Sequence, residues 1–168
     1  MMTVTQHELR YADITGDVMQ HQLHTAIEID APPAEVWAVL TDLDTYADWN
    51  PFIVSAAGTV AVGERLVNRL SPPGGKAMTF KPTVTDVVEH QTFEWLGRLL
   101  VPGVFDGRHR FELVPTEAGG TRLTHTEHFR GVLVRFMRSS LDAQTLAGFE
   151  AMNEALKDRA EQVVRNGS

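Results

Sequence analysis

Residues 104–129 read VFDGRHRFELVPTEAGGTRLTHTEHF, and most of the architecture can be inferred from them. Apolar and polar residues alternate along 104–114 and again along 121–129, which is the pattern of a strand with one buried face. Between these segments, residues 116–120 (TEAGG) are typical of a tight turn. A connection this short joins antiparallel strands, because a parallel return needs about a dozen residues or more. The stretch therefore predicts a β-hairpin.

The alternation also indicates which side chains share the buried face of this hairpin. In the first strand Phe111 marks the buried face, and His109 shares it. In the second strand Leu123 marks that face, and His125 and Glu127 share it. Two histidines and a carboxylate are therefore expected among apolar side chains.

The turn sets the register of the two strands. If it is centred near Ala118, His109 lies opposite Glu127 and Phe111 lies opposite His125. Cross-strand neighbours have Cβ atoms about 5 Å apart. We therefore expect His109 and Glu127 to meet inside the protein, with His125 diagonal to them.

Further strands and two short helices are expected before the hairpin. The strands are predicted at residues 24–30, 52–57, 64–70, 77–88 and 92–96. Pro32 and Pro33 are typical of a helix start, because proline is tolerated where the first N–H groups have no partner. Leu43, Tyr46 and Trp49 recur every three residues and predict a second short helix.

After Gly131 the period of the sequence becomes helical. Apolar residues and one threonine recur every three, four or seven positions: Leu141, Thr145, Phe149, Met152, Leu156 and Val163. A helix of about 25 residues is about 37 Å long. We predict an α+β fold in which a curved antiparallel sheet of six to seven strands wraps around this C-terminal helix.

A twisted sheet around a helix can enclose a cavity, and the inward residues are then candidates for ligand binding. Asn68 joins them, because it lies between Leu66 and Leu70 in a predicted strand. The candidate ligand-binding residues are Asn68, Phe80, Phe93, Trp95, His109, Phe111, His125, Glu127, Phe129, Thr145, Phe149 and Met152. The alternative is a filled core without a ligand.

The polar group of His109, His125 and Glu127 has three interpretations. It is a structural pair that fixes the strand register, the polar end of a ligand site, or an acid/base catalyst. His109, Glu127 and His125 are the candidate catalytic residues. No metal and no cofactor are expected, and His7, His21, His24 and His90 are expected at the surface.

Composition narrows the possible partners. The net charge is −7 and no Lys/Arg cluster is evident, which argues against nucleic acid and disfavours stable docking on an anionic membrane surface. No segment has the uninterrupted apolar length that stable membrane insertion needs. There are no cysteines, and residues 1–20 lack the apolar segment of a signal peptide, so a cytoplasmic location is expected. Residues 1–20 are expected to form a loose arm or an edge strand, and residues 21–168 one domain. The oligomeric state stays open, with a dimer among the options.

Two groups of motifs resemble the SRPBCC superfamily, named for its START, polyketide-cyclase and birch-pollen-allergen members. The first runs Ile27-x-Ile29-x-Ala31-Pro32-Pro33-x-x-Val36-Trp37, then Asp42, then Trp49-Asn50-Pro51-Phe52. The second runs Pro102-Gly103-x-Phe105-x-Gly107-x-His109-x-Phe111 and His125-x-Glu127-x-Phe129-x-Gly131, and it is similar to the bacterial polyketide cyclase/dehydrase and lipid-transport branch. The resemblance covers residues 23–164 and implies a helix-grip fold with a cavity for lipids, polyketides or other apolar ligands.

Three functions follow as hypotheses. The first is binding or carriage of a small hydrophobic molecule, for which residues 132–137 are candidates for the mouth of the cavity, the alternative being a packed lead-in to the helix. The second is an enzyme of the polyketide cyclase, aromatase or dehydratase type. The third is a protein-interaction or co-chaperone-like regulator, which an exposed apolar patch would favour.

Overall fold

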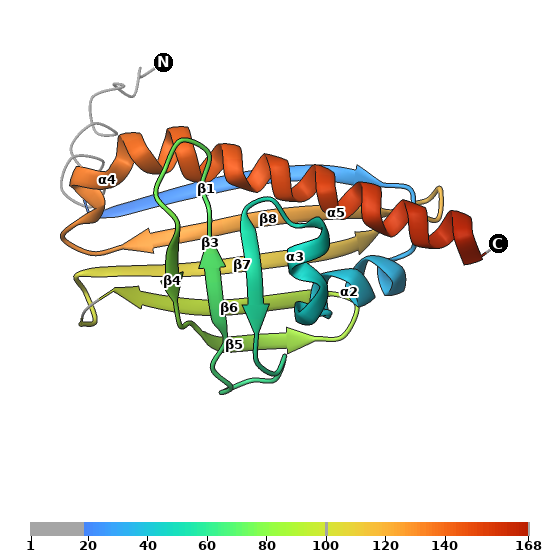
Figure 1. The fold of residues 1–168 in the computed structure, drawn as a ribbon, viewed down its shortest axis with the longest axis horizontal. Coiled ribbons are helices and arrows are strands. Elements are labelled where there is room, and N and C mark those ends of the chain that lie inside the picture. Colours follow the sequence, from blue (N-terminus) through green and yellow to red (C-terminus); the bar gives the residue numbers. More distant parts are fainter. Residues whose placement is uncertain (1–18, 100, 168) are drawn as a thin grey trace, which may run out of the picture.

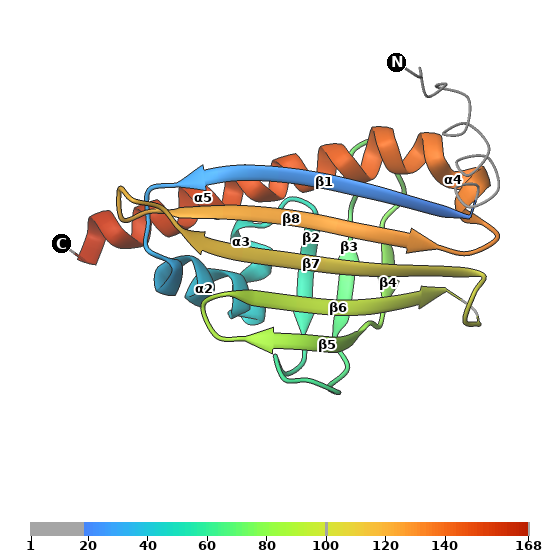
Figure 2. The ribbon, with the colours of Figure 1, turned by 180° about the vertical axis from the view of Figure 1, so that it is seen from behind.

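The chain folds into a five-stranded antiparallel sheet whose inner face is covered by helices and by a second, three-stranded sheet (Figures 1 and 2). We describe a computed structural model, which covers residues 19–99 and 101–167. The larger sheet has the order β1-β8-β7-β6-β5 and the smaller one β2-β3-β4. The strands are β1 (Gln20–Ile29), β2 (Ile53–Ala57), β3 (Val67–Leu70), β4 (Met78–Phe80), β5 (Thr83–Val88), β6 (Thr92–Leu99), β7 (Phe105–Pro115) and β8 (Thr121–Arg130). The predicted α+β class is confirmed.

Helices occupy two places in the chain, as predicted. The first group follows β1 and consists of α2 (Pro33–Thr41), η1 (Leu43–Thr45) and α3 (Tyr46–Trp49). The second group is one continuous run of α4 (Val134–Ser140), the π-helical turn η2 (Leu141–Thr145) and α5 (Leu146–Gly167). This run lies along the inner face of the larger sheet beside β1 and β8 (Figure 1).

Local chemistry explains where the short helices begin and end. Pro33 opens α2, where its missing N–H has no partner to lose. After α3, the side-chain Oδ1 of Asn50 accepts hydrogen bonds from the backbone N–H groups of Phe52 (3.0 Å) and Ile53 (2.8 Å). These bonds turn the chain from α3 into β2.

The predicted strand at residues 77–88 is wrong in one respect, because it is two strands in different sheets. β4 pairs with β3, and β5 pairs with β6. The break falls at Lys81 and Pro82, and a proline has no N–H to continue the hydrogen-bond ladder. An isolated bridge between Arg65 and Thr83 links the two sheets.

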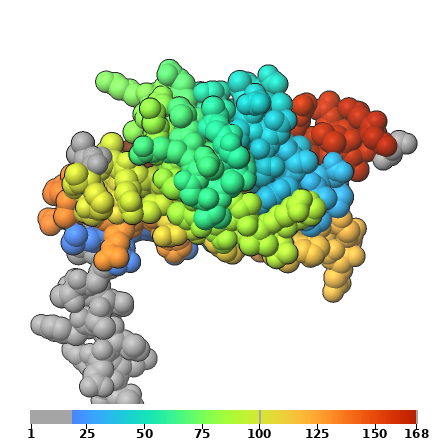
Figure 3. Space-filling model, turned by 90° about the horizontal axis from the view of Figure 1, so that it is seen from below, coloured from blue at the N-terminus to red at the C-terminus, as the bar shows by residue number. Residues whose placement is uncertain are grey.

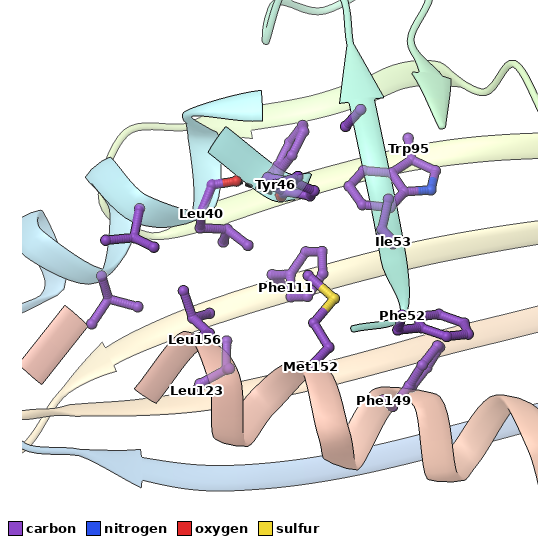
Figure 4. Close-up of a cluster of buried hydrophobic side chains, with 14 of the residues drawn as sticks. Leu40, Tyr46, Phe52, Ile53, Trp95, Phe111, Leu123, Phe149, Met152 and Leu156 are labelled. Carbon is purple, nitrogen blue, oxygen red and sulfur yellow. Dashed lines mark hydrogen bonds between the residues drawn. The ribbon is translucent and has the colours of Figure 1, made fainter. Parts of the chain in front are cut away.

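The core lies between the inner face of the larger sheet, α5 and β2 (Figure 4). Phe149, Met152 and Leu156 point from α5 toward Phe111 and Leu123 of the sheet, and all five are completely buried. Burying a side chain of this size stabilises the fold by about 1.5–3 kcal/mol. The helix therefore adheres to the sheet through its apolar stripe.

Two further predictions concern the N-terminal arm and membrane-spanning helices. Of the predicted arm 1–20, residues 1–18 lie outside the described residues, whereas Gln20 already begins β1. Among the helices that the structure describes, none combines the length and apolar character needed to cross a bilayer.

Candidate functional site

The register of β7 and β8 is the predicted one. His109 lies opposite Glu127, and Phe111 lies opposite His125. All four side chains point to the inner face, because they share the parity of the buried Leu113. The turn at residues 116–120 thus places two histidines and a carboxyl group under α5.

The two histidines are hydrogen-bonded to each other. Nε2 of His109 lies 2.7 Å from Nε2 of His125, and the ring centroids are 4.6 Å apart. Such a bond needs a proton on one nitrogen and a lone pair on the other. The rest of the network decides which histidine donates.

Asn153 of α5 was not predicted and completes this network. Its Nδ2 donates to Oγ1 of Thr25 (2.8 Å), so its Oδ1 is the atom that accepts from Nδ1 of His125 (2.8 Å). His125 then presents the lone pair of Nε2, and His109 donates to it. Asn153 follows Phe149 by four residues, so its place on the apolar stripe was a signal in the sequence.

Glu127 ends the network. Its Oε2 lies 3.5 Å from Nδ1 of His109, the ring nitrogen that carries no proton in this arrangement. Burial raises the pKa of Glu127 to about 8, so at neutral pH its carboxyl group is protonated. We call the series Glu127, His109, His125, Asn153 and Thr25 the polar chain.

Both histidines of the polar chain are neutral. Burial lowers the pKa of His109 to about 3. Burial, with the neighbouring His109, lowers the pKa of His125 well below its ordinary value. Trp95 stacks on His109 at 4.4 Å and Phe149 stacks on His125 at 3.9 Å, so both rings are enclosed by aromatic faces.

Two glycines leave room on the inner face beside Glu127. Gly97 of β6 and Gly107 of β7 lie directly opposite each other. A Cβ at Gly97 would lie 3.3 Å from the ring of Phe80, and a Cβ at Gly107 would lie 2.5 Å from Oε1 of Glu127. The Phe80 ring and the Glu127 carboxyl group therefore occupy the space that two side chains would fill. We call this space the glycine recess.

Asn68 lies next to this region and faces inward as predicted. It pairs with Phe80 across β3 and β4, and only 1% of its surface is exposed. Among the described residues, its Oδ1 is a buried acceptor without a hydrogen-bond partner. A ligand hydroxyl or N–H is the group that such an atom lacks.

We expected an open cavity between the sheet and α5, but two hollows of the molecule lie elsewhere. One hollow, of about 490 Å³, lies among α2, η1, the segment after β2, and β5. The other, of about 450 Å³, lies mainly on the outer face of the larger sheet. The predicted lining residues Phe93, Trp95, Phe111, Phe149 and Met152 are completely buried and pack against their neighbours.

The remaining candidates lie at the end of the inner face where β8 stops. Phe129 is buried and stacks with His21 at 6.5 Å, Thr145 is half-buried in η2, and Phe80 is half-buried at the edge. His21 corrects an expectation, because it is mostly covered and its Nε2 lies 2.7 Å from Oδ1 of Asp142. Its odd position on β1 puts it on the inner face.

The other histidines and the predicted mouth have mixed outcomes. His24 and His90 are exposed as predicted, and His7 lies outside the described residues. In residues 132–137, Val134 is completely buried whereas Phe136 is 76% exposed. Part of this segment is thus a packed lead-in to the helix, and part faces solvent.

Comparisons with known proteins agree with this architecture. Residues 20–161 match the family described as polyketide cyclase / dehydrase and lipid transport. No curated protein sequence matches the chain.

Solved structures show the same fold at low sequence identity. The Zhui aromatase/cyclase from Streptomyces sp. R1128 is similar with a TM-score of 0.73 and 19% identity, over 89% of this chain and 98% of that one. A START superfamily protein from Mycobacterium smegmatis gives a TM-score of 0.62 at 18% identity, over 85% and 99%. The di-domain ARO/CYC StfQ of the steffimycin biosynthetic pathway gives 0.71 at 13% identity over 90% of this chain, which spans 54% of StfQ.

Proposed function

The chain belongs to the polyketide cyclase/dehydrase and lipid-transport family, and on that basis we propose that it binds a small, largely apolar molecule at the glycine recess. Family membership supports a ligand-binding or polyketide-cyclase role. The finer proposal is that the polar end of the ligand meets Asn68 and Glu127, while its apolar part lies between the larger sheet and the start of α5.

The observation that carries this proposal is a pair of buried polar groups with unmet hydrogen-bonding capacity. Oδ1 of Asn68 has no partner among the described residues, and Oε2 of Glu127 lies 3.5 Å from Nδ1 of His109, which is too far for a good hydrogen bond. Leaving such groups dry and unpaired costs roughly 1–3 kcal/mol each. A ligand with a hydroxyl group would donate to Asn68, and one with a carbonyl group would accept from the protonated Glu127.

Ligand entry requires a movable side chain, and Phe80 is the one in place. It is half-buried on β4, a strand of three residues at the edge of the smaller sheet. Its ring is seated above Gly97. A rotation of Phe80 away from Gly97 would open the glycine recess without disturbing the buried aromatic residues.

Native mass spectrometry of the protein after incubation with a cell lipid extract tests the proposal. The wild type is expected to retain a bound mass, and Asn68→Leu is expected to lose it, because leucine offers no acceptor. Val67→Leu is the matched control, since Val67 is the neighbouring residue of β3 and is exposed. A wild type that never retains a ligand, or equal retention by both variants, would reject this binding site.

A second function, an enzyme of the cyclase, aromatase or dehydratase type, is favoured by the polar chain. Glu127 is an acid that is protonated at neutral pH, and it can donate its proton to a ketone oxygen of the ligand. In this case Glu127→Gln abolishes turnover of a poly-β-ketone while the free energy of unfolding does not fall; a fully active variant would contradict it.

A further inference from the structure

Exposed apolar side chains gather at one end of the molecule, where β1 begins, β6 turns into β7, and β8 leads into α4. They are Met19, Leu99, Val101, Val132 and Phe136, and we call them the apolar end. Backbone hydrogen bonds hold the three segments together: Gly131 donates to Met19, Val132 to Gly103 and Leu133 to Val104. The three segments meet in every view, and they lie together at the left of Figure 3.

Phe136 is the most exposed of these residues. It lies in the first turns of α4 with 76% of its surface in water, and the guanidinium group of Arg135 lies 5.4 Å from the centre of its ring. A large aromatic side chain in this position adds nothing to the core. Its exposure together with four other apolar side chains is a feature of interaction surfaces.

The charges around the apolar end oppose the charge of the whole chain. Arg98, Arg130 and Arg135 are exposed beside it. The acidic neighbour Asp106 is largely covered; its Oδ2 accepts a hydrogen bond from the backbone of Gly103, and its Oδ1 lies 3.8 Å from Nε of Arg98 and offsets part of that charge. A protein with a net charge of −7 thus presents a locally basic surface here.

A groove on the outer face of the larger sheet continues from this end. Strand register arranges its residues in two rows across β1, β8, β7 and β6: Gln20, Arg130, Asp106 and Arg98, then Gln22, His128, Arg108 and Leu96. These residues line the hollow of about 450 Å³, which we call the basic groove. Within residues 19–99 and 101–167, the side-chain hydrogen bond of Arg108 is the one from Nη1 to Glu94, which leaves its other N–H groups to face an anion.

We propose that the apolar end and the basic groove dock the protein on a membrane surface that contains anionic phospholipids. The apolar side chains enter the boundary between head groups and acyl chains, and the arginines bind the phosphates. A soluble anion would bind the arginines but would leave Phe136 in water. A purely apolar partner would cover Phe136 but would have no use for the three arginines. An anionic membrane surface uses both features. This docking goes beyond the proposed ligand site and does not rest on it.

Co-flotation of the full chain with vesicles tests the proposal. Binding is expected to vesicles of equal parts phosphatidylcholine and phosphatidylglycerol, to weaken with added salt, and to be far weaker with phosphatidylcholine alone. Phe136→Ser is expected to reduce the partition coefficient about tenfold, because a phenyl group no longer leaves water. Val114→Ser is the control, since Val114 is also apolar and exposed but lies at the end of β7 far from the apolar end.

Two arginines on one strand allow a matched test of how charge contributes to vesicle binding. Arg130 and Arg122 both lie on the outer face of β8, at its two ends. Arg130→Gln is expected to weaken vesicle binding about fivefold, and Arg122→Gln to leave it unchanged. Equal effects of the two substitutions would mean that net charge, and not this surface, attracts the vesicles.

Three results would overturn the proposal. One is a wild type that stays unbound with both kinds of vesicle. The second is equal binding to both, which removes the role of the arginines. The third is a dimer by light scattering that Phe136→Ser dissociates without any flotation, which assigns the surface to a second copy. Phe136→Ser is expected to retain a ligand in solution as the wild type does, so a loss of vesicle binding in this variant can be told apart from a loss of the ligand site.

Discussion

Two carboxyl groups on opposite faces of the larger sheet are buried, yet their chemistry is opposite. Glu94 on the outer face is 7% exposed and Glu127 on the inner face is 14% exposed. Burial acts to raise both pKa values, but hydrogen bonds from Thr85, Arg108 and Arg110 outweigh it for Glu94, whose pKa is lowered. Glu127 has no such donors, and its pKa rises to about 8.

The comparison shows that a buried carboxyl group in this sheet stays charged where hydrogen-bond donors outweigh burial, and becomes neutral where they are missing. Outside, Arg110 also bonds Asp86 (3.1 Å) and Glu112 (2.9 Å), so charged residues neutralise one another. Inside, the polar chain is neutral along its length and is surrounded by aromatic rings. A neutral interior is suited to an apolar guest, and a charged exterior is suited to anions.

The largest effect is expected from breaking the inner network. His125→Leu leaves the Nε2–H of His109 and the Oδ1 of Asn153 buried without partners, which costs about 3 kcal/mol or more in the free energy of unfolding. His128→Leu is the control, because His128 is on the same strand but exposed on the outer face. Urea unfolding measures both; similar small losses would mean that the inner network contributes little.

The dependence of the free energy of unfolding on pH is expected to reveal the protonation state of Glu127. Its folded pKa of about 8 exceeds the unfolded value of about 4.3, so its stabilising effect is complete below pH 4.3 and is lost as the pH rises through 8. His109, with a folded pKa of about 3, acts in the opposite direction and only below about pH 6.5.

The window between these values isolates the carboxyl group. From about pH 6.5 to 8 the free energy of unfolding should fall by about 2 kcal/mol in the wild type, and Glu127→Gln should remove the fall. Urea unfolding at several pH values measures it. A wild-type curve that is flat over this range would show that Glu127 is already ionised at neutral pH.

Replacing each carboxyl group by an amide sharpens the contrast between the faces. Glu94→Gln should cost about 1–2 kcal/mol at pH 7, because Arg108 and Arg110 lose an anion, although both are partly hydrated. Glu127→Gln should stabilise the protein by about 3 kcal/mol, because the wild-type carboxylate must take up a proton on folding at pH 7 and the amide need not. Thermal unfolding of both variants at pH 7 measures the difference, and the reverse order would refute the assignment of charge.

The hairpin could be predicted from the sequence because its information is local. Alternation and a five-residue turn determine that His109 faces Glu127, and the structure confirms this register. The direct bond between His109 and His125 was expected only as diagonal proximity. Its geometry depends on ring rotations that residue spacing does not specify.

Features that depend on how distant elements pack could not be predicted in the same way. Asn153 lies on the apolar stripe of α5, but the rotation and height of the helix decide that it reaches His125 and Thr25. The filling of the expected cavity depends on packing contacts such as that of Phe52 with Phe149. These contacts join separate elements, up to 128 residues apart in the chain, and are beyond the reach of pattern analysis.

The smallest change in stability is expected from a substitution in the glycine recess, which lies on the inner face of the larger sheet. Gly97→Ala places a methyl group 3.3 Å from the Phe80 ring, so the ring must shift, and we expect a loss of less than about 1 kcal/mol. In a Phe80→Leu background the same substitution should cost less, since the smaller side chain leaves space. A double-mutant cycle by thermal unfolding measures this coupling, and a coupling of zero would show that Phe80 does not rest on Gly97. In the proposed route of ligand entry Phe80 rotates away from Gly97, so the size of the coupling also measures how tightly the ring closes the recess.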